Sequence, residues 1–322
     1  MSRYTSLLRY SFSRLALFPL MLWVISTLVF ILLRVAPGDP VDAILGNRAS
    51  DEAKDALREE LGLNISLIAQ YTKFIIGLLK GDLGEALANQ EPVKDIIYKS
   101  LPASLELGLT ALFIAIFIGL LIGFIGIVKP EGKTDLAGRL YGISTYAIPP
   151  FWAAMMAQIF FGVILGWLPV GGRFPPGMNQ PQGTGFLIAD SIFNKDWEAL
   201  KGTIRYLLLP ASTLGILLSG VFSRTIRINM AKILQSDYIQ AAESRGLKKR
   251  RILLKHALPN ALLPFLTIAG ITIASLIGGA LLIEITFSWP GLALRLQEAI
   301  NQRDYPVVQG IVVVIAALVV LI

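Results

Sequence analysis

The sequence predicts an all-α membrane protein, a polytopic bundle of six transmembrane helices with a small external lobe after the first helix. Of its 322 residues 54% are hydrophobic and only 16% are charged. A soluble domain is rarely so apolar, so the bilayer is the expected solvent. Six stretches lack Asp, Glu, Lys, Arg and His, and each is at or near the ~20 residues that cross hydrocarbon. They cover residues 15–33, 107–128, 140–172, 206–223, 257–283 and 305–322.

The first stretch follows basic residues, as the apolar core of a signal peptide does. It is 19 residues long, however, and it ends in Leu-Leu-Arg34 instead of small residues, which predicts a retained helix. The third and fifth stretches exceed the length of one span, so part of each is expected at the interface. Pro149 and Pro150 predict a kink in the third. Gly119 and Gly123 form a small-xxx-small pair that predicts close helix packing.

The distribution of Lys and Arg predicts the orientation. Basic residues precede the first span and separate the second from the third, and residues 224–260 carry nine basic against two acidic groups. Residues 35–101 carry seven basic and eleven acidic groups. By the positive-inside rule the N-terminus, residues 224–260 and the C-terminus are cytoplasmic, and residues 35–101 are external.

Three regions follow from this topology. We expect a cytoplasmic N-terminus with the first transmembrane helix at 1–34, an external lobe at 35–101, and a five-helix transmembrane core at 102–322 that carries a cytoplasmic loop at 236–260.

Two helices are expected in the external lobe. Ser50 caps a charged helix over 51–61 that Gly62 ends. Apolar side chains at helical spacing predict an amphipathic helix against the membrane surface or the bundle; they are Leu67, Tyr71, Phe74, Ile75 and Leu78. The lobe either packs between helix ends or helps to receive an external protein.

The cytoplasmic loop predicts a short helix followed by a basic run. Good helix formers follow Ser236, and Gly246 is well placed to stop a helix of about three turns. Ala241 and Ala242 would leave a smooth surface for another protein's backbone. Lys and Arg fill positions 248–251, and charge alone would predict only a solvated loop.

The spacing in this loop resembles the EAA loop of ABC importer membrane subunits. In that family Glu-Ala-Ala is followed by three residues, Gly, nine residues, Ile, one residue and Leu-Pro. Here Gln240 replaces Glu and His256 replaces Ile, while Gly246, Leu258 and Pro259 keep their spacing. Both substitutions are typical of the peptide-importer branch.

Further motifs resemble dipeptide and oligopeptide permease subunits in the expected order. They are RVAPGDPVDAILG at 34–46, GDLGEAL at 81–87, LPASLELGL at 101–109, ALLIEITFSWPGLA at 280–293 and RDYPVVQG at 303–310. The chain therefore resembles the DppB/OppB-type permease family of ABC importers over residues 15–322. The resemblance implies a type I importer permease fold in the prokaryotic plasma membrane. It also implies a cytoplasmic tail beyond Ile322.

The resemblance also implies partners and a mechanism. A second homologous permease, in a heterodimer or a homodimer, would complete the path, two ATPase subunits would bind ATP and Mg²⁺, and an external binding protein would deliver a peptide-like substrate. The coupling residues carried over are Asp237, Gln240, Ala241, Ala242, Glu243, Gly246, His256, Leu258 and Pro259. No cofactor or metal is expected on this chain.

The residue inventory disfavours other classes of function. With no Cys and a single His, neither a metal cluster nor a catalytic triad is available, so no enzyme activity is expected. The segment GIVKPEGKT at 126–134 has five residues between its glycines where a P-loop needs four. The basic residues alternate with apolar spans, which argues against nucleic acid.

Some alternatives stay open. Glu106 and Glu284 end spans on the external side, where they are either interfacial or candidate lining of the pathway mouth. Importers of nickel and other small solutes share this architecture. A secondary transporter would also be an apolar bundle, but it more often needs buried ionisable groups and has no use for an EAA-like loop.

Overall fold

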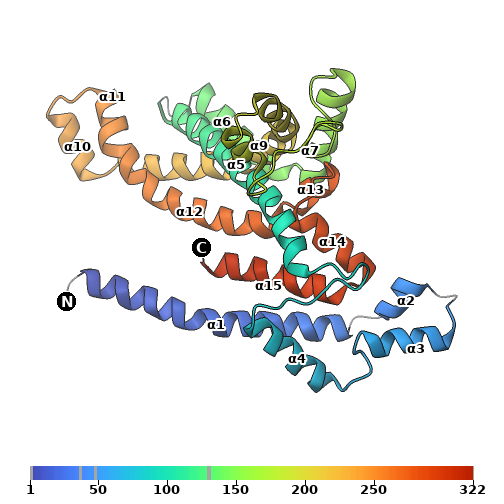
Figure 1. Cartoon of the computed structure of the whole chain (residues 1–322). Helices are drawn as coiled ribbons and strands as arrows, with labels where there is room; N and C mark the ends of the chain where they lie inside the picture. The colour runs from blue at the N-terminus through green and yellow to red at the C-terminus, as the bar shows by residue number, and fades with distance from the viewer. Residues whose placement is uncertain (1–2, 36–37, 47–48, 129–131, 322) are drawn as a thin grey trace. The chain divides into compact units, whose positions relative to one another are not determined.

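The computed structural model describes residues 3–35, 38–46, 49–128 and 132–321, and within these ranges the chain is helical without a strand (Figure 1). The helices are α1 Arg3–Val35, α2 Pro40–Leu45, α3 Asp51–Glu60, α4 Leu67–Leu79, α5 Val93–Val128, α6 Lys133–Ala147, α7 Pro150–Ala157, the π-helix η1 Gln158–Ile164, α8 Leu187–Phe193, α9 Trp197–Leu234, α10 Asp237–Ser244, α11 Lys249–Arg251, the π-helix η2 Ile252–Ala257, α12 Leu258–Gly279, α13 Leu281–Thr286, α14 Leu292–Gln302 and α15 Tyr305–Leu321.

The chain divides into two compact units. Unit 1 comprises Met1–Pro102 and Gly291–Ile322, and unit 2 comprises Ala103–Pro290. Helix α5 therefore begins in unit 1 and ends in unit 2. The C-terminal helices α14 and α15 join the first helix and the 35–101 segment in one unit, a grouping that charge and hydropathy along the chain did not suggest.

The all-α membrane fold is confirmed, but the count of six spans is not. Among the described residues four helices are long and apolar enough to cross a bilayer, in α1, α5, α9 and the segment Lys249–Leu276. The pair α6 and α7–η1 makes a fifth if it counts as one span. The expected sixth span is α15, an apolar helix of 17 residues. The fifth expected span is also interrupted, because α12 ends at Gly279 and α13 begins at Leu281.

The predicted proline kink is confirmed and is sharp. Helices α6 and α7–η1 are bent by 99° at the break between Ala147 and Pro150. Proline cannot donate the backbone hydrogen bond that would continue α6, and its ring excludes the residue before it from helical geometry. Pro150 instead occupies the first turn of α7, where the missing donor costs nothing.

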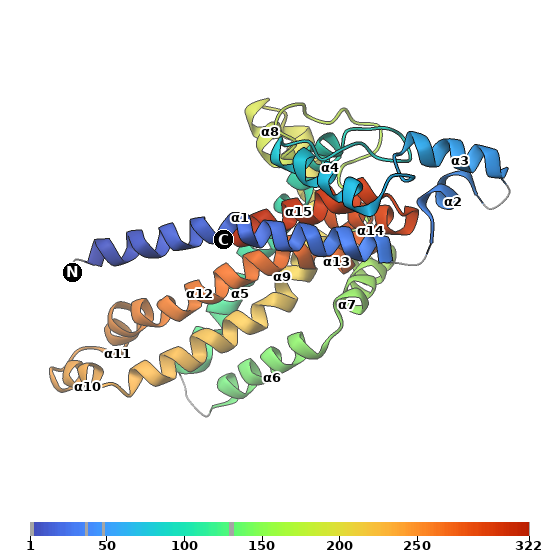
Figure 2. The same ribbon diagram turned by 90° about the horizontal axis from the view of Figure 1, so that it is seen from below.

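Helix α9 organises unit 2. It is 38 residues long and packs against α6, α7, α8, α10, α12 and α13. Helix α5 approaches it through the predicted glycine pair: a Cβ on Gly119 would lie 2.9 Å from the Ser219 carbonyl oxygen, and one on Gly123 would lie 2.7 Å from that of Ser223. The two backbones can therefore approach only because these positions lack side chains. Figure 2 shows α6, α9 and α12 side by side, with α10 and α11 beyond one end of α9.

In unit 1 the amphipathic helix α4 packs on the transmembrane helix α1. This contact is the second of the two alternatives that the sequence left open, the membrane surface and the bundle. The Phe30 ring of α1 stacks on Phe74 at 5.8 Å and meets Tyr71 edge-on at 5.2 Å. The Thr27 and Tyr71 hydroxyl groups are 2.7 Å apart. Beside α4 the predicted cap is also confirmed, since the Ser50 hydroxyl accepts the Ala53 N–H of α3 at 3.3 Å.

Helix α2 and its N-cap Asp39 are held to α3 by charge. The Arg58 guanidinium donates to the Asp39 carboxylate at 2.6 Å, and Lys54 pairs with Asp42 at 2.8 Å. Burial alone would raise the pKa of Asp39, but hydrogen bonds from Arg58 and the Val41 N–H and the charges of Arg58 and Lys54 hold that pKa below its usual value.

Asp304 joins two distant segments of unit 1. Its carboxylate accepts the Leu87 N–H at 2.8 Å and the Val307 N–H at 3.3 Å, so it ties the 84–92 loop to the N-terminus of α15. Burial raises the pKa of Asp304, and these backbone donors, with Ala88, offset only part of that rise.

Candidate functional site

The helix expected to begin after Ser236 is present and follows the end of α9. It is α10, which has eight residues and is therefore nearer two turns than the three expected. Gly246 ends it with φ of 73°: its N–H bonds the Glu243 carbonyl at 2.8 Å, and the Leu247 N–H bonds that of Ala242 at 3.3 Å. This pair of hydrogen bonds is the Schellman arrangement, which places a left-handed residue, usually Gly, just after the helix.

One face of α10 is covered by the chain itself. Ile239 and Ala242 are buried in the core cluster that includes Ile252 and Leu253 of η2. Ala241 is exposed. The two alanines therefore lie on different faces, and Ala241 alone belongs to the surface that a partner could touch. The other exposed members of the expected coupling set on this helix are Asp237, Gln240 and Glu243.

A hydrogen-bonded bridge ties α10 to the start of α12. The Asn260 amide donates to the Tyr238 hydroxyl at 2.9 Å and to the His256 carbonyl at 3.0 Å. His256 is half-buried in η2, and in α12 Leu258 is half-buried while Pro259 is exposed. Neither Tyr238 nor Asn260 was singled out from the sequence, because each is an ordinary polar residue outside the EAA-like spacing.

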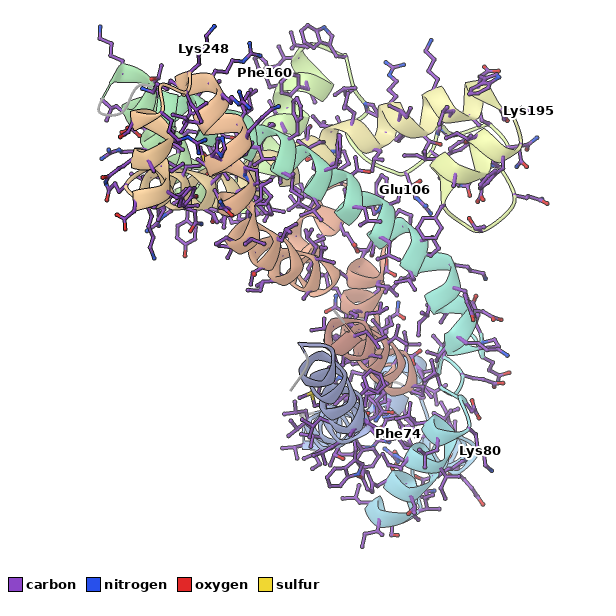
Figure 3. All side chains as sticks on the ribbon, turned by 90° about the vertical axis from the view of Figure 1, so that its left-hand side faces the viewer. Phe74, Lys80, Glu106, Phe160, Lys195 and Lys248 are labelled. Carbon is purple, nitrogen blue, oxygen red and sulfur yellow. The ribbon has the colours of Figure 1, made fainter. Side chains whose placement is uncertain are left out.

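The basic run after Gly246 is exposed. Residues 248–251 and Lys255 project from α11 and η2, and within the described part of the chain none of them forms an ion pair. Figure 3 shows Lys248 at one end of unit 2, and Glu106 and Lys195 lie toward the other. Lys248 of the basic run and Glu106 thus lie toward opposite ends of unit 2.

Glu106 is buried beside an arginine. It is 5% exposed, and its carboxylate accepts the Arg173 guanidinium at 2.7 Å and the Ile188 N–H at 2.8 Å. Arg173 also donates to the Gly185 carbonyl at 2.7 Å and lies over the Trp289 ring at 5.8 Å. The group fastens the 165–190 segment to α5 within unit 2.

Glu284 is buried nearby in α13. It is 0% exposed and accepts the Ser104 hydroxyl at 2.6 Å, and the Trp289 indole donates to the Ala103 carbonyl at 2.9 Å. Neither carboxylate therefore reaches the surface of this chain. Among the described residues no group of three or more His, Asp or Glu side chains has the proximity that a metal ion requires.

Comparison with known proteins finds family matches over both the N-terminal and the C-terminal parts of the chain. Residues 115–322 match the family described as binding-protein-dependent transport system inner membrane component, and residues 7–108 match its N-terminal region.

Full-length relatives are similar over nearly the whole chain. A dipeptide transport system permease protein of Alkalihalophilus pseudofirmus is 37% identical over 98% of this chain and 95% of its own length. A di/tripeptide transport system permease protein of Pseudomonas aeruginosa is 37% identical over 92% of this chain and 89% of its own. The dipeptide transport system permease protein of Escherichia coli is 35% identical over 92% of this chain and 89% of its own length. The chain thus belongs to the family of inner membrane permease components of binding-protein-dependent ABC importers.

Proposed function

We propose that this chain forms half of the translocation pathway of an ATP-driven importer of dipeptides or oligopeptides. The observation that carries the proposal is α10, an exposed helix closed by Gly246, in a family member whose relatives are named for dipeptide and di/tripeptide transport. The second permease subunit, the two ATPases and the external binding protein would be separate chains. ATP and Mg²⁺ would bind to the ATPases.

The orientation follows from the positive-inside rule. The excess of basic residues over 224–260 supports a cytoplasmic α10, on the side where ATP is available. The N-terminus would then be cytoplasmic and the 35–101 segment external, where it would help to receive the binding protein.

In this scheme the exposed face of α10 docks in a cleft of an ATPase subunit. Closure of the ATPase dimer would push α10, and the covered face of the helix would pass that push to η2 and α12. Ile239 and Ala242 support this because they pack into the same core cluster as Ile252. Tyr238 and Asn260 add a polar tie beside this covered face. Rigid-body tilting of packed helices is a common conformational change in proteins that switch between two states.

Affinity purification of the tagged chain from its native membrane, with mass spectrometry of the proteins recovered, tests the assembly. We expect a second permease and one or two ATPases, in amounts that fall in a Gly246→Val variant. Recovery of the chain alone, under conditions in which a related importer stays intact, would refute the coupling role.

Uptake tests the substrate. Cells that depend on this importer should accumulate a radiolabelled dipeptide and lose that uptake when the chain is deleted. Loss of nickel uptake with unchanged dipeptide uptake would refute the peptide assignment and leave the importer assignment intact.

A further inference from the structure

A groove between α6 and α9 in unit 2 is not used by the proposed function. It has a volume of about 460 Å³. Its walls are mainly apolar, with Ile143, Tyr146 and Ala147 from α6 and Ile228 from α9. Tyr146 is 86% exposed and Ile143 is 65% exposed, so both side chains offer apolar surface to whatever fills the groove.

Three arginines gather at one end of the groove. They are Arg139 of α6 and Arg224 and Arg227 of α9. One buried carboxylate, Asp135, serves two of them: it accepts Arg139 at 2.6 Å and Arg227 at 3.4 Å. Arg224 is exposed and forms no ion pair with the residues that the structure describes.

The sequence places the arginines at the edge of the hydrocarbon. Arg224 immediately follows the uncharged residues 206–223, and 18 helical residues span roughly 27 Å, close to the ~30 Å hydrocarbon thickness. Arg139 immediately precedes the uncharged stretch that begins at Leu140. The two helices bring these two boundaries together, so the arginines lie at the depth of the lipid headgroups.

The rest of the groove extends in the other direction. Ile143, Tyr146 and Ala147 follow Arg139 along α6, within the uncharged stretch. The groove therefore has a cationic end at headgroup depth and an apolar wall that continues into the hydrocarbon. A phospholipid matches both features, because its phosphate diester suits the cationic end and its acyl chains suit the apolar wall.

We propose that this groove holds an anionic phospholipid, with its phosphate on Arg224 and Arg139 and an acyl chain against Ile143 and Tyr146. A guanidinium presents several N–H donors in a planar fork that suits phosphate oxygens. An arginine without an anion at the hydrocarbon boundary is costly, and basic pockets between transmembrane helices are suited to anionic headgroups. Inorganic phosphate would leave the apolar wall uncovered.

The site would lie in the leaflet that faces the cytoplasm, if the proposed orientation holds. It does not depend on which solute is transported. A different occupant, the second permease subunit, would cover the same groove with protein, and the experiments below distinguish the two.

Lipid retention is the first test. The chain is purified with its associated subunits in a mild detergent, exchanged into nanodiscs that contain phosphatidylglycerol and phosphatidylcholine, and analysed by native mass spectrometry. We expect bound phosphatidylglycerol to be enriched over phosphatidylcholine. Arg224→Gln should lower that enrichment about fivefold, as expected for one basic residue. Arg224→Lys should keep most of it.

Arg205→Gln is the matched control. Arg205 is the exposed arginine at the other end of the same uncharged stretch of α9, outside the groove, where it donates to the Trp167 carbonyl at 3.2 Å. This variant should keep the enrichment. Equal retention of the two lipids, equal enrichment in the Arg205 and Arg224 variants, or displacement of the lipid by millimolar inorganic phosphate would overturn the proposal.

Crosslinking supplies a second readout. Because the chain has no cysteine, Ile143→Cys gives a single attachment point for a short photoactivatable probe. A crosslink to phosphatidylglycerol supports the proposal. A crosslink to a second polypeptide in place of lipid would refute it, because the groove would then be part of a subunit interface.

Discussion

Replacement of Gly246 by Val should uncouple α10 from its partner through the backbone. Gly246 has φ of 73°, and a Cβ at this position would meet nothing within 4 Å in this chain. The requirement for glycine at this position is thus not steric. The cost is conformational: an L-residue in the left-handed region loses about 1–2 kcal/mol, and a β-branched side chain more.

The magnitude is large for so small a helix. Helix α10 has eight residues, too few to be stable alone, so its geometry depends on its end and its packing. A loss of about 2 kcal/mol lowers the equilibrium ratio of the correctly ended helix to other conformations roughly thirtyfold. The assay is dipeptide uptake in cells, with ATPase subunits recovered on the tagged chain as a second readout.

Two further variants separate the causes. Gly246→Asn should keep substantial uptake, since Asn tolerates the left-handed region. Gly62→Val is the matched control, because Gly62 has φ of 65°, follows α3 and also has nothing within 4 Å of a Cβ. It should leave ATPase recovery unchanged. Full uptake with Val at 246, or equal loss with Asn and Val, would refute the backbone explanation.

Three other predictions follow from buried contacts. Gly123→Val should destabilise unit 2 strongly, because the Cβ would lie 2.7 Å from the Ser223 carbonyl oxygen. Thermal unfolding of the purified protein in detergent measures this loss of stability. Arg173→Met should cost about 3–5 kcal/mol by leaving the buried Glu106 carboxylate without its cation, and a stability equal to wild type would contradict this. Asp304→Asn should change the pH dependence: because the pKa of Asp304 is raised in the folded state, the wild type should lose stability relative to the variant as pH rises from ~4 through the folded pKa, a trend that thermal unfolding at several pH values would detect.

Local chemistry made part of the fold predictable. Pro149 and Pro150 forbid a continuous helix, Gly119 and Gly123 permit close approach, and Gly246 permits a left-handed turn. Each of these effects acts within a few residues or depends on the absence of a side chain. Sequence reasoning recovers such effects because no knowledge of distant partners is required.

The remaining features depend on contacts between distant residues. Arg173 and Glu106 are 67 positions apart, and nothing in either neighbourhood specifies the other. The exact number of spans is a further case, because an uncharged stretch reveals neither the size of the bend between α6 and α7 nor that α15 has only 17 residues. The two alanines of α10 are a different case: adjacent helical residues point about 100° apart, so both could not share one exposed face.

The contacts of α10 also limit how it can transmit a push. Ile239 and Ala242 bury one face in the core, and the Tyr238 to Asn260 hydrogen bond fixes another edge to the start of α12. A helix held on two sides cannot swing independently of what it touches. Any displacement of α10 must therefore move η2 and α12 with it. Because η2 is a π-helix, a form that is common at functional sites, bending is expected there before the contacts of α10 are lost.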